Sequence, residues 1–201
     1  MEPERWFEIY REIISDFNFS PERDDESAKL MESLGREKLM DCGILEKIIS
    51  GKEVAVIGGG VRDRIESETV ITAGKAIIKW MRLSDRVPDV HVTDMEEPDD
   101  ILLSLEKSGT ILVLHAHGDN MDRIRSAIPK LRRFIGTTQN RPFNRIYNFG
   151  GFTDGDRAAI IAKRFGAEKI ILHGFDFEWR EGIKGKKLQW ARKILEIEGL
   201  I

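Results

Sequence analysis

The sequence predicts an α/β fold in which a mostly parallel, open sheet has helices on both faces and is preceded by amino-terminal helices. After residue 50, short β-branched apolar runs alternate with helical patterns, which is the order of elements that builds a parallel sheet. The runs are apolar along nearly their whole length, as is typical of strands covered on both faces. Glycines and polar residues follow their carboxyl ends, and this is the edge at which open α/β sheets bind ligands.

Residues 1–50 predict helices rather than strands. A second helix is expected after Pro21 and a short one over residues 44–49. We therefore expect a helical segment over residues 1–50 and an α/β domain, which carries the functional site, over residues 51–201. The helical segment either covers the sheet or makes a homodimer contact, and the sequence leaves both roles open. The first helix has apolar residues at helical spacing, namely Trp6, Phe7, Tyr10, Ile13 and Ile14.

The expected elements of the α/β domain follow one another along the chain. Strands are expected over residues 53–57, 69–72, 87–93, 110–114, 145–148 and 169–172. Helices are expected over residues 74–83, 99–107, 120–131, 154–165 and 186–197. Glycine-containing stretches between them predict the loops in which the polar residues lie.

Composition argues against several classes of function. The formal net charge of -3 gives no reason to expect nucleic acid as a partner. The one cysteine, Cys42, permits no intramolecular disulfide and indicates a reducing cytoplasm. No apolar run is long enough to cross a bilayer, and residues 1–11 lack the apolar core of a signal peptide. We therefore expect a cytoplasmic protein without a membrane partner.

Three glycines, Gly58, Gly59 and Gly60, follow the first apolar run. Glycine lets the backbone approach a phosphate closely, and a helix that starts after such a turn offers free amide donors. A tight strand-to-helix turn explains the triplet equally well, because any such turn uses glycine. Arg62 and Arg64 follow and favour an anion, so we expect the triplet to bind phosphate.

Asp94 ends the third apolar run and is followed by Glu96, Glu97, Asp99 and Asp100. Carboxylates so close repel one another unless a cation or solvent offsets their charge. Mg²⁺ is bound by one or two carboxylates together with substrate phosphates, so we expect Asp94 to be a magnesium ligand. Glu97, Asp99 and Asp100 are expected to be solvated and to begin a helix, whose dipole favours acidic residues there.

The run His-Ala-His-Gly-Asp-Asn over residues 115–120 follows the fourth apolar run. Two histidines and a carboxylate suit a transition metal, whereas Asp119 by itself suits Mg²⁺. Capping of the next helix is the alternative explanation of Asp119 and Asn120. We expect Asp119 to be a magnesium ligand and a catalytic residue.

Two expected loops carry small or aromatic residues that suit a heterocycle or a phosphate. The first holds Thr137, Thr138 and Gln139, and an ordinary connecting loop is the alternative. We expect the second to approach the ligand through its glycines and to stack a phenylalanine on a flat ring, with core packing of its two rings as the alternative. The second loop contains Asn148, Phe149, Gly150, Gly151 and Phe152.

Charged residues complete the expected site. Asp154 and Asp156 add carboxylates for Mg²⁺, and Arg157 adds a bidentate phosphate donor. Helix capping explains one of the two aspartates but hardly both. A mobile basic loop further along is expected to close over a triphosphate, with a solvated charge run as the alternative. That loop contains Lys184, Lys186 and Lys187.

Together, four motifs resemble the archaeal 6-hydroxymethyl-7,8-dihydropterin pyrophosphokinases. They are His-Ala-His-Gly-Asp-Asn (115–120), Gly-Thr-Thr-Gln (136–139), Asn-Phe-Gly-Gly-Phe-Thr-Asp-Gly-Asp-Arg (148–157) and Gly-Phe-Asp-Phe (174–177). The resemblance runs from about Val54 to the end and implies a fold similar to the catalytic domain of thiamin pyrophosphokinase. It also implies the reaction: ATP as co-substrate and a pterin alcohol give AMP and the pterin diphosphate, with Mg²⁺, in tetrahydromethanopterin or folate-type cofactor synthesis.

Two positions depart from the family's pattern. Thr-Asp-Met-Glu (93–96) stands where the family has Thr-Asp-Leu-Asp, so a carboxylate is kept. Thr-Ala-Gly-Lys (72–75) stands where the family often has Ala-Asp-Gly, so this loop lacks an aspartate.

The residues and the resemblance together predict how the site works. ATP is expected along the carboxyl edge, with its phosphates near residues 58–60, and Arg157 with the basic loop is expected to offset developing charge. Asp119 and Asp154 both suit the general base. The alternatives are a metal-dependent phosphoesterase, a thiamin-type diphosphokinase and a nucleotide-binding module without turnover. Mg²⁺ is expected between four carboxylates, those of Asp94, Asp119, Asp154 and Asp156.

Overall fold

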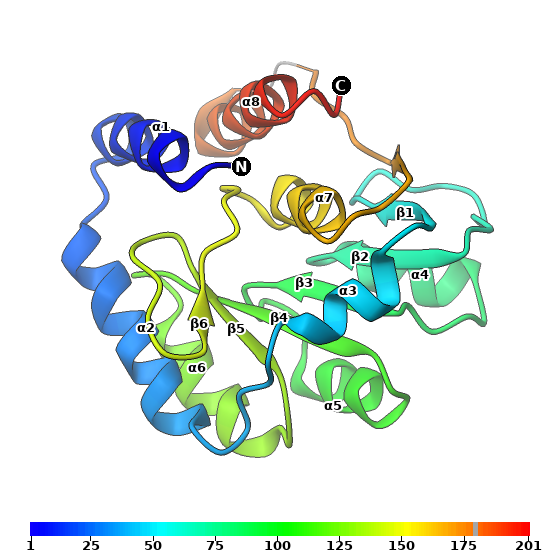
Figure 1. Cartoon of the computed structure of the whole chain (residues 1–201), viewed down its shortest axis with the longest axis horizontal. Helices are drawn as coiled ribbons and strands as arrows, with labels where there is room; N and C mark the ends of the chain where they lie inside the picture. The colour runs from blue at the N-terminus through cyan, green and yellow to red at the C-terminus, as the bar shows by residue number, and fades with distance from the viewer. Residues whose placement is uncertain (179–180) are drawn as a thin grey trace.

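The computed structural model describes residues 1–178 and 181–201, and within them the chain forms a seven-stranded sheet (Figure 1). Neighbouring strands are all parallel, in the order β6-β5-β4-β3-β2-β1-β7. The predicted parallel α/β sheet is thereby confirmed. The strands are β1 (Glu53–Ile57), β2 (Thr69–Ala73), β3 (Val90–Thr93), β4 (Ile111–Ala116), β5 (Ile135–Thr138), β6 (Ile146–Tyr147) and β7 (Lys169–His173).

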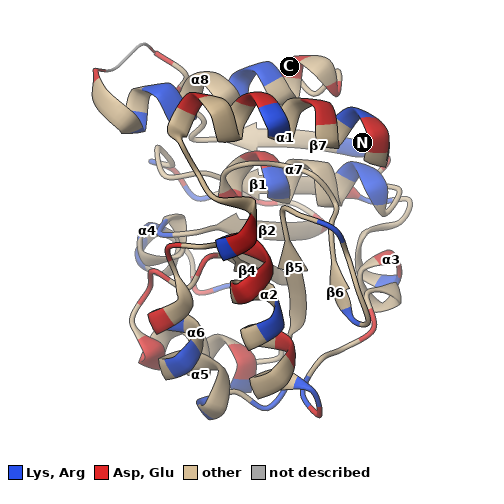
Figure 2. Cartoon of the chain, turned by 90° about the vertical axis from the view of Figure 1, so that its left-hand side faces the viewer, with Lys and Arg blue, Asp and Glu red and all other residues tan. Residues whose placement is uncertain are grey.

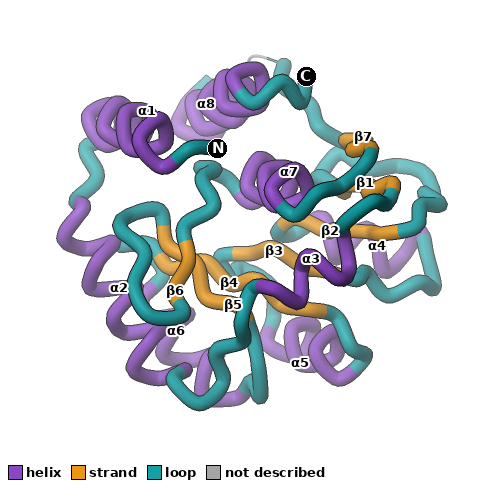
Figure 3. The backbone as a smooth tube through the Cα atoms, in the orientation of Figure 1, coloured by secondary structure: helices purple, strands orange, loops and turns teal. Residues whose placement is uncertain are grey.

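Helices cover both faces of the sheet, as Figure 3 shows. Apolar side chains of α2, α4, α5 and α6 pack against one face, around Trp80 and Met31. Helices α3 and α7 cover the other face, and α1 and α8 pack outside α7 through Trp6, Ile160 and Ile194. The helices are α1 (Pro3–Phe17), α2 (Pro21–Gly35), α3 (Gly43–Ile49), α4 (Ala76–Leu83), α5 (Asp99–Lys107), α6 (Met121–Ala127), the 3-10 turn η1 (Ile128–Lys130), α7 (Asp154–Arg164) and α8 (Gly182–Ile197).

The central strands are mostly apolar because both of their faces are covered. Every residue of β2, β3 and β4 is buried, and buried polar side chains among them find partners within the sheet, as Thr72 and His91 do at 2.9 Å. The β-branched residues that dominate these runs also fit the pleated surface well.

Helix α7 crosses back over the sheet. From β1 to β6 each strand lies beside its predecessor, whereas β7 pairs with β1. Helix α7 connects β6 to β7 and contacts β1, β2 and β3 on the way. Its first residue, Asp154, lies against Gly74 in the loop that follows β2. The start of α7 therefore lies at the carboxyl edge of the sheet.

The amino-terminal helices pack onto the sheet. Helix α2 contacts β4, β5 and α6, and the indole N–H of Trp6 in α1 donates a hydrogen bond to the backbone carbonyl of Gln139 at 2.8 Å. The helices thus cover the sheet, which is one of the two roles that the sequence left open. A domain boundary at residue 50 stays a prediction.

Three expectations about local structure are wrong. Residues 136–138 belong to strand β5 rather than to a loop. Residues 61–68, which follow the glycine triplet, contain no helix, so no helix amino terminus offers its amides there. Helix α8 begins at Gly182, so Lys184, Lys186 and Lys187 lie in a helix instead of a loop.

Charged side chains are concentrated on the helices. Figure 2 shows acidic and basic residues interspersed along them, with few on the strands. Lys193 of α8, for example, pairs with Glu12 of α1 at 2.8 Å. Among the helices of residues 1–178 and 181–201, none is long and apolar enough to cross a membrane.

Candidate functional site

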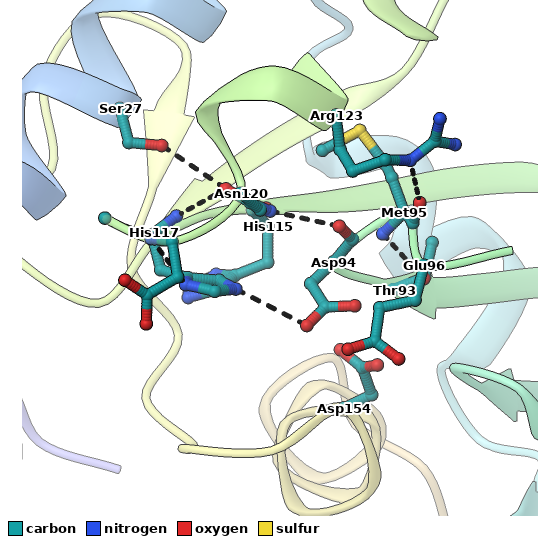
Figure 4. A network of polar contacts seen from close by, with 12 residues as sticks. Ser27, Thr93, Asp94, Met95, Glu96, His115, His117, Asn120, Arg123 and Asp154 are labelled. Atoms are coloured by element: carbon teal, nitrogen blue, oxygen red, sulfur yellow. Dashed lines mark hydrogen bonds and ion pairs between the residues drawn. The ribbon is translucent and has the colours of Figure 1, made fainter. Parts of the chain in front are cut away.

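Three carboxylates converge at the carboxyl edge of the sheet. Asp94 and Glu96 lie in the loop after β3, Asp154 is the first residue of α7, and their side chains point toward one another (Figure 4). Burial, and next the negative charge of Asp94, raise the pKa of Asp154 well above its usual value, although Arg157 opposes the shift. We call Asp94, Glu96 and Asp154 the inner carboxylates. Burial and mutual repulsion together disfavour the charged form of Asp154.

The loop after β3 is held in one conformation. Met95 has a positive φ of 66°, which is costly for a residue other than glycine. The Thr93 hydroxyl accepts from the Met95 N–H at 2.9 Å and donates to Glu97 at 2.6 Å. Arg123 donates to the Met95 carbonyl at 2.6 Å and to the Glu97 carbonyl at 2.9 Å. These contacts fix the directions of Asp94 and Glu96. Glu97 is only 1% exposed, so the expectation that it is solvated is wrong.

His117 is the hydrogen-bonding partner of Asp94. Its Nε2 lies 3.4 Å from Asp94 Oδ2, and its Nδ1 accepts from the backbone N–H of Asp119 at 3.3 Å. Because Nδ1 accepts, Nε2 carries a proton and donates it to Asp94. Burial alone would raise the pKa of Asp94, but the hydrogen bond and charge of His117, with Arg157 and Lys187, lower it. His117 therefore orients Asp94.

His115 is part of the core rather than of an exposed metal site. Its side chain is buried, and its Nδ1 lies 3.0 Å from the Thr137 hydroxyl. Burial, and then the charges of Arg157 and His117, lower the pKa of His115 well below its usual value, so the ring is neutral. Among residues 1–178 and 181–201, no group of three or more histidine, cysteine, aspartate or glutamate side chains is arranged to hold a metal ion.

Arg157 is the buried counter-ion of the inner carboxylates. Its side chain is 3% exposed and lies 3.4 Å from Asp154. It also donates to the backbone carbonyls of Gly151 and Phe152, at 3.2 and 3.4 Å. Gly151 has a φ of 92°, and a Cβ there would lie 2.6 Å from the Cα of Arg157. The glycine is therefore needed to seat the arginine beside Asp154.

Asp156 lies two residues from Asp154 but has a different role. Its carboxylate accepts hydrogen bonds from the backbone N–H groups of Phe152 and Thr153, both at 2.7 Å, and from the Thr153 hydroxyl. Together with Thr153 it forms a capping box at the start of α7. The structure thus assigns capping to Asp156 and places Asp154 among the inner carboxylates.

Asp119 does not join the inner carboxylates. Its backbone N–H is bound to Nδ1 of His117, on the side of the ring away from the nitrogen that faces Asp94. Its side chain is 64% exposed and lies 3.9 Å from Arg23 of α2. Both residues line a cavity of about 430 Å³, counting its open mouth, between α2 and the loop after β4. A magnesium-binding role of Asp119 stays a prediction.

The glycine triplet is closed by backbone packing. The N–H groups of Gly58 and Gly60 donate to the carbonyls of His173 and Gly174, both at 2.8 Å. A Cβ on Gly58 or Gly60 would lie within 2.9 Å of the Gly174 carbonyl oxygen. Gly58 and Gly60 are therefore required because their backbone packs against the loop after β7. Gly59 does not make this contact and is exposed.

The polar residues at the carboxyl ends of β5 and β6 are held by hydrogen bonds to neighbouring elements and to one another. The Thr137 hydroxyl donates to the Leu114 carbonyl at 3.0 Å, and the Gln139 side chain donates to Asp24 at 2.7 Å. Asn148 donates to the carbonyls of Gln139 and Asn140 and accepts from Gly150. Thr138 accepts from the Asn140 N–H at 3.3 Å. These residues shape the wall of the edge by connecting its loops.

The two phenylalanines of the 148–157 run lie in different places. Phe149 is buried and stacks on Tyr147, so core packing explains it. Phe152 is partly buried, and the centre of its ring lies 5.3 Å from the centre of the Phe17 ring of α1. The ammonium group of Lys187 lies 5.9 Å from the centre of the Phe152 ring, next to the start of α7.

The two lysines of α8 also differ. Lys186 pairs with Asp16 at 3.2 Å and lies over the Phe17 ring, which commits it to α1. Lys187 lies close enough to the inner carboxylates to lower the pKa of Asp94. Of the two, Lys187 is the one that faces the site.

Several residues of this edge were not identified as site residues from the sequence. The sequence shows Glu96 as one of several acidic residues without distinguishing it, and nothing in it marks Lys75, which forms an ion pair with Glu96. Arg23 and Asp24 lie in α2, far from every motif. The carboxylate of Asp24 is buried and accepts from the Gly118 N–H at 2.7 Å. A local sequence pattern cannot identify Asp24 as a site residue, because its contact is with a loop far away in the sequence.

Carboxylates and a buried arginine at the carboxyl edge of a parallel sheet are typical of α/β enzymes that act on phosphates. Residues 62–182 match the model of the MptE-like 6-hydroxymethylpterin diphosphokinases. A Methanothermobacter thermautotrophicus protein named 6-hydroxymethyl-7,8-dihydropterin pyrophosphokinase is 36% identical over 187 residues, covering 88% of this chain and 79% of that protein. The proteins of the same name from Methanocaldococcus jannaschii and Pyrococcus furiosus are 32% and 33% identical, covering 97% and 98% of this chain and 95% and 94% of their own lengths. The chain belongs to the MptE-like 6-hydroxymethylpterin diphosphokinase family.

Proposed function

We propose that the chain transfers the β,γ-diphosphate of ATP to the hydroxymethyl group of 6-hydroxymethyl-7,8-dihydropterin and releases AMP. Relatives that match most of the chain are named for this acceptor and for pyrophosphate transfer. The structural observation that carries the proposal is the convergence of the inner carboxylates beside buried Arg157. The product enters tetrahydromethanopterin or folate-type cofactor synthesis in the cytoplasm.

The inner carboxylates fit Mg²⁺. The raised pKa of Asp154, which burial and the charge of Asp94 cause, is what neighbouring carboxylates show when no cation offsets them. Mg²⁺ takes one or two protein carboxylates and completes its shell with phosphates and water, so Asp94 and Asp154 suffice, with Glu96 beside them. When bound there, the ion supplies charge neutralisation for the phosphates.

The residues of the chain position the reactants and offset charge. The hydroxymethyl oxygen attacks the β-phosphorus in line, the bond from that phosphorus to the α,β-bridging oxygen breaks, and AMP leaves with that oxygen. His117 holds Asp94 in place, and Arg157 holds Asp154. Lys187 offsets negative charge from the side of α8. Asp154 is better placed than Asp119 to accept the hydroxyl proton, because it lies among the inner carboxylates.

A product assay tests the proposal. The chain is incubated with ATP and Mg²⁺ and with 6-hydroxymethyl-7,8-dihydropterin, thiamin or no acceptor, and AMP is quantified. We expect AMP with the pterin alone, one pterin diphosphate for each AMP, and none after chelation of the metal. Steady ATP hydrolysis without acceptor would instead indicate a phosphoesterase. AMP formed only with thiamin would change the acceptor, and ATP binding without AMP under every acceptor would indicate a binding module.

A further inference from the structure

The cavity between α2 and the loop after β4 is a built site. Its walls come from the corner between α1 and α2, including Phe19 and Arg23, and from the loop that carries His117 and Asp119. The space of about 430 Å³ between these walls includes the open mouth, so the cavity is shallow and a ligand enters it from solvent. The corner lies outside residues 62–182, the part of the chain that the family model covers.

The corner is fixed to the sheet, so the cavity has a defined shape. The buried carboxylate of Asp24 accepts hydrogen bonds from the Tyr10 hydroxyl, from the Gly118 N–H at 2.7 Å and from the Gln139 side chain at 2.7 Å. Arg23 donates to the Gly118 carbonyl at 2.9 Å. A Cβ on Gly118 would lie 2.8 Å from the Cβ of Arg23, so only glycine permits this contact.

His117 separates the cavity from the inner carboxylates. Its ring lines the cavity, and its Nε2 faces Asp94 at 3.4 Å. A molecule in the cavity therefore lies on one side of this ring, while Asp94 and Asp154 lie on the other. This is the arrangement that a transfer reaction needs, because the acceptor must lie beside the phosphate site without filling it.

The polar groups of the cavity suit one edge of a pterin. Arg23 and Asp119 are only loosely paired, at 3.9 Å, with side chains 56% and 64% exposed, so a ligand reaches both. The pyrimidine edge of a pterin carries two adjacent N–H donors, which match a carboxylate, next to a carbonyl oxygen, which matches a guanidinium. Phe19 adds an aromatic surface for a flat ring.

We propose that this cavity is the acceptor subsite, in which Asp119 and Arg23 bind the pyrimidine edge of the pterin and its hydroxymethyl group points past His117 toward the inner carboxylates. The inference rests on the proposed function, which supplies the acceptor. It gives Asp119 the role of recognising the acceptor rather than of binding Mg²⁺. It also gives the amino-terminal helices a role in specificity.

The test measures binding of 6-hydroxymethyl-7,8-dihydropterin alone, by fluorescence titration without ATP or metal. We compare the wild-type chain with Arg23→Gln and Asp119→Asn. The matched controls are Arg125→Gln and Asp122→Asn, which remove the same charges from an exposed ion pair on α6. We expect each cavity variant to weaken pterin binding by roughly tenfold or more, to raise the KM for the pterin and to leave the KM for ATP unchanged. The controls should bind like the wild type, and thermal melting confirms that each variant is folded.

The outcomes separate this inference from the proposed function. If the cavity variants bind the pterin as the wild type does, while the wild type releases AMP, the subsite is wrong and the activity stands. If the wild type binds the pterin through these residues but releases no AMP, the activity is wrong and the subsite stands. A raised KM for ATP in place of the pterin would assign the cavity to the nucleotide, and a wild type that neither binds the pterin nor releases AMP overturns both.

Discussion

Asp94 and Asp154 lie on the opposite side of His117 from the Arg23–Asp119 pair, and their side chains are less exposed. Asp154 is partly buried beside like charges, and burial and Asp94 raise its pKa well above the usual value. Arg23 and Asp119 carry opposite charges, but both are largely exposed and 3.9 Å apart. Charges interact strongly only where water is excluded. The first group is therefore suited to a cation, and the second is free to bind an uncharged polar ligand.

The largest effect is expected at Asp154. Asp154→Asn should lower kcat/KM for AMP release by roughly 100-fold or more, because metal-based charge stabilisation is worth several kcal/mol. Asp119→Asn should act chiefly through the KM for the pterin. Steady-state kinetics with ATP and pterin varied separately checks both, with Asp122→Asn as the control. Equal losses of kcat in the Asp154 and Asp119 variants would remove the distinction between the two regions.

A change at Asp156 tests whether its carboxylate is structural. Asp156→Ala removes three hydrogen bonds at the start of α7 and should lower the free energy of unfolding by about 2 kcal/mol. Urea unfolding measures this loss. The folded variant should keep the wild-type dependence on Mg²⁺ concentration. A shifted Mg²⁺ dependence with unchanged stability would instead make Asp156 a metal ligand.

The stability of the metal-free protein should depend on pH through Asp154. Because burial raises the pKa of Asp154 in the folded state, the folded chain keeps a proton that the unfolded chain releases. This contribution to stability is complete below the unfolded pKa and is lost as pH rises through the folded pKa. Asp154→Asn should therefore have a higher Tm than the wild type at the upper end of this range, and the difference should shrink toward acid pH. Melting curves in a chelator test this, and an Asn variant that is less stable at every pH would contradict it.

The smallest effect is expected at Lys75. Its ion pair with Glu96 is exposed, with 62% and 57% of the two side chains accessible. Lys75→Gln should change the free energy of unfolding by no more than about 0.5 kcal/mol, because water screens such pairs. A larger change, measured by urea unfolding, would show that the electrostatic coupling of the inner carboxylates extends to the protein surface.

The sequence predicted the strands whose side chains are large and apolar, and missed the one whose side chains are small. Strand β5 contains Gly136 because a Cβ there would lie 2.6 Å from Ile146 and 2.9 Å from Leu39. A strand packed so closely cannot carry the apolar run that marks the others. Helix α8 was expected to start later, because Gly182 and Gly185 weaken its pattern.

The position of the site at the carboxyl edge followed from the sequence, but the roles of its residues did not. Asp154 and Asp156 are two residues apart at the start of one helix, and only the direction of each side chain separates a site residue from a cap. Positions 58 and 60 do require glycine, but the reason is that a Cβ at either position would meet the backbone of Gly174. Asp24 contacts Gly118, which is 94 residues away in the sequence. A local sequence pattern cannot predict a contact between residues so far apart.

The pairing of β7 with β1 affects how the chain is made. Glu53 lies opposite Lys169, so one edge of β1 has no partner until the chain has been made as far as residue 173. Contacts between such distant residues form slowly, and an open strand edge invites pairing with another molecule. A chain that is truncated before β7 therefore leaves one edge of β1 without a hydrogen-bonding partner. Pairing with β7 moves β1, whose last four residues are fully buried, from the edge of the sheet to its interior.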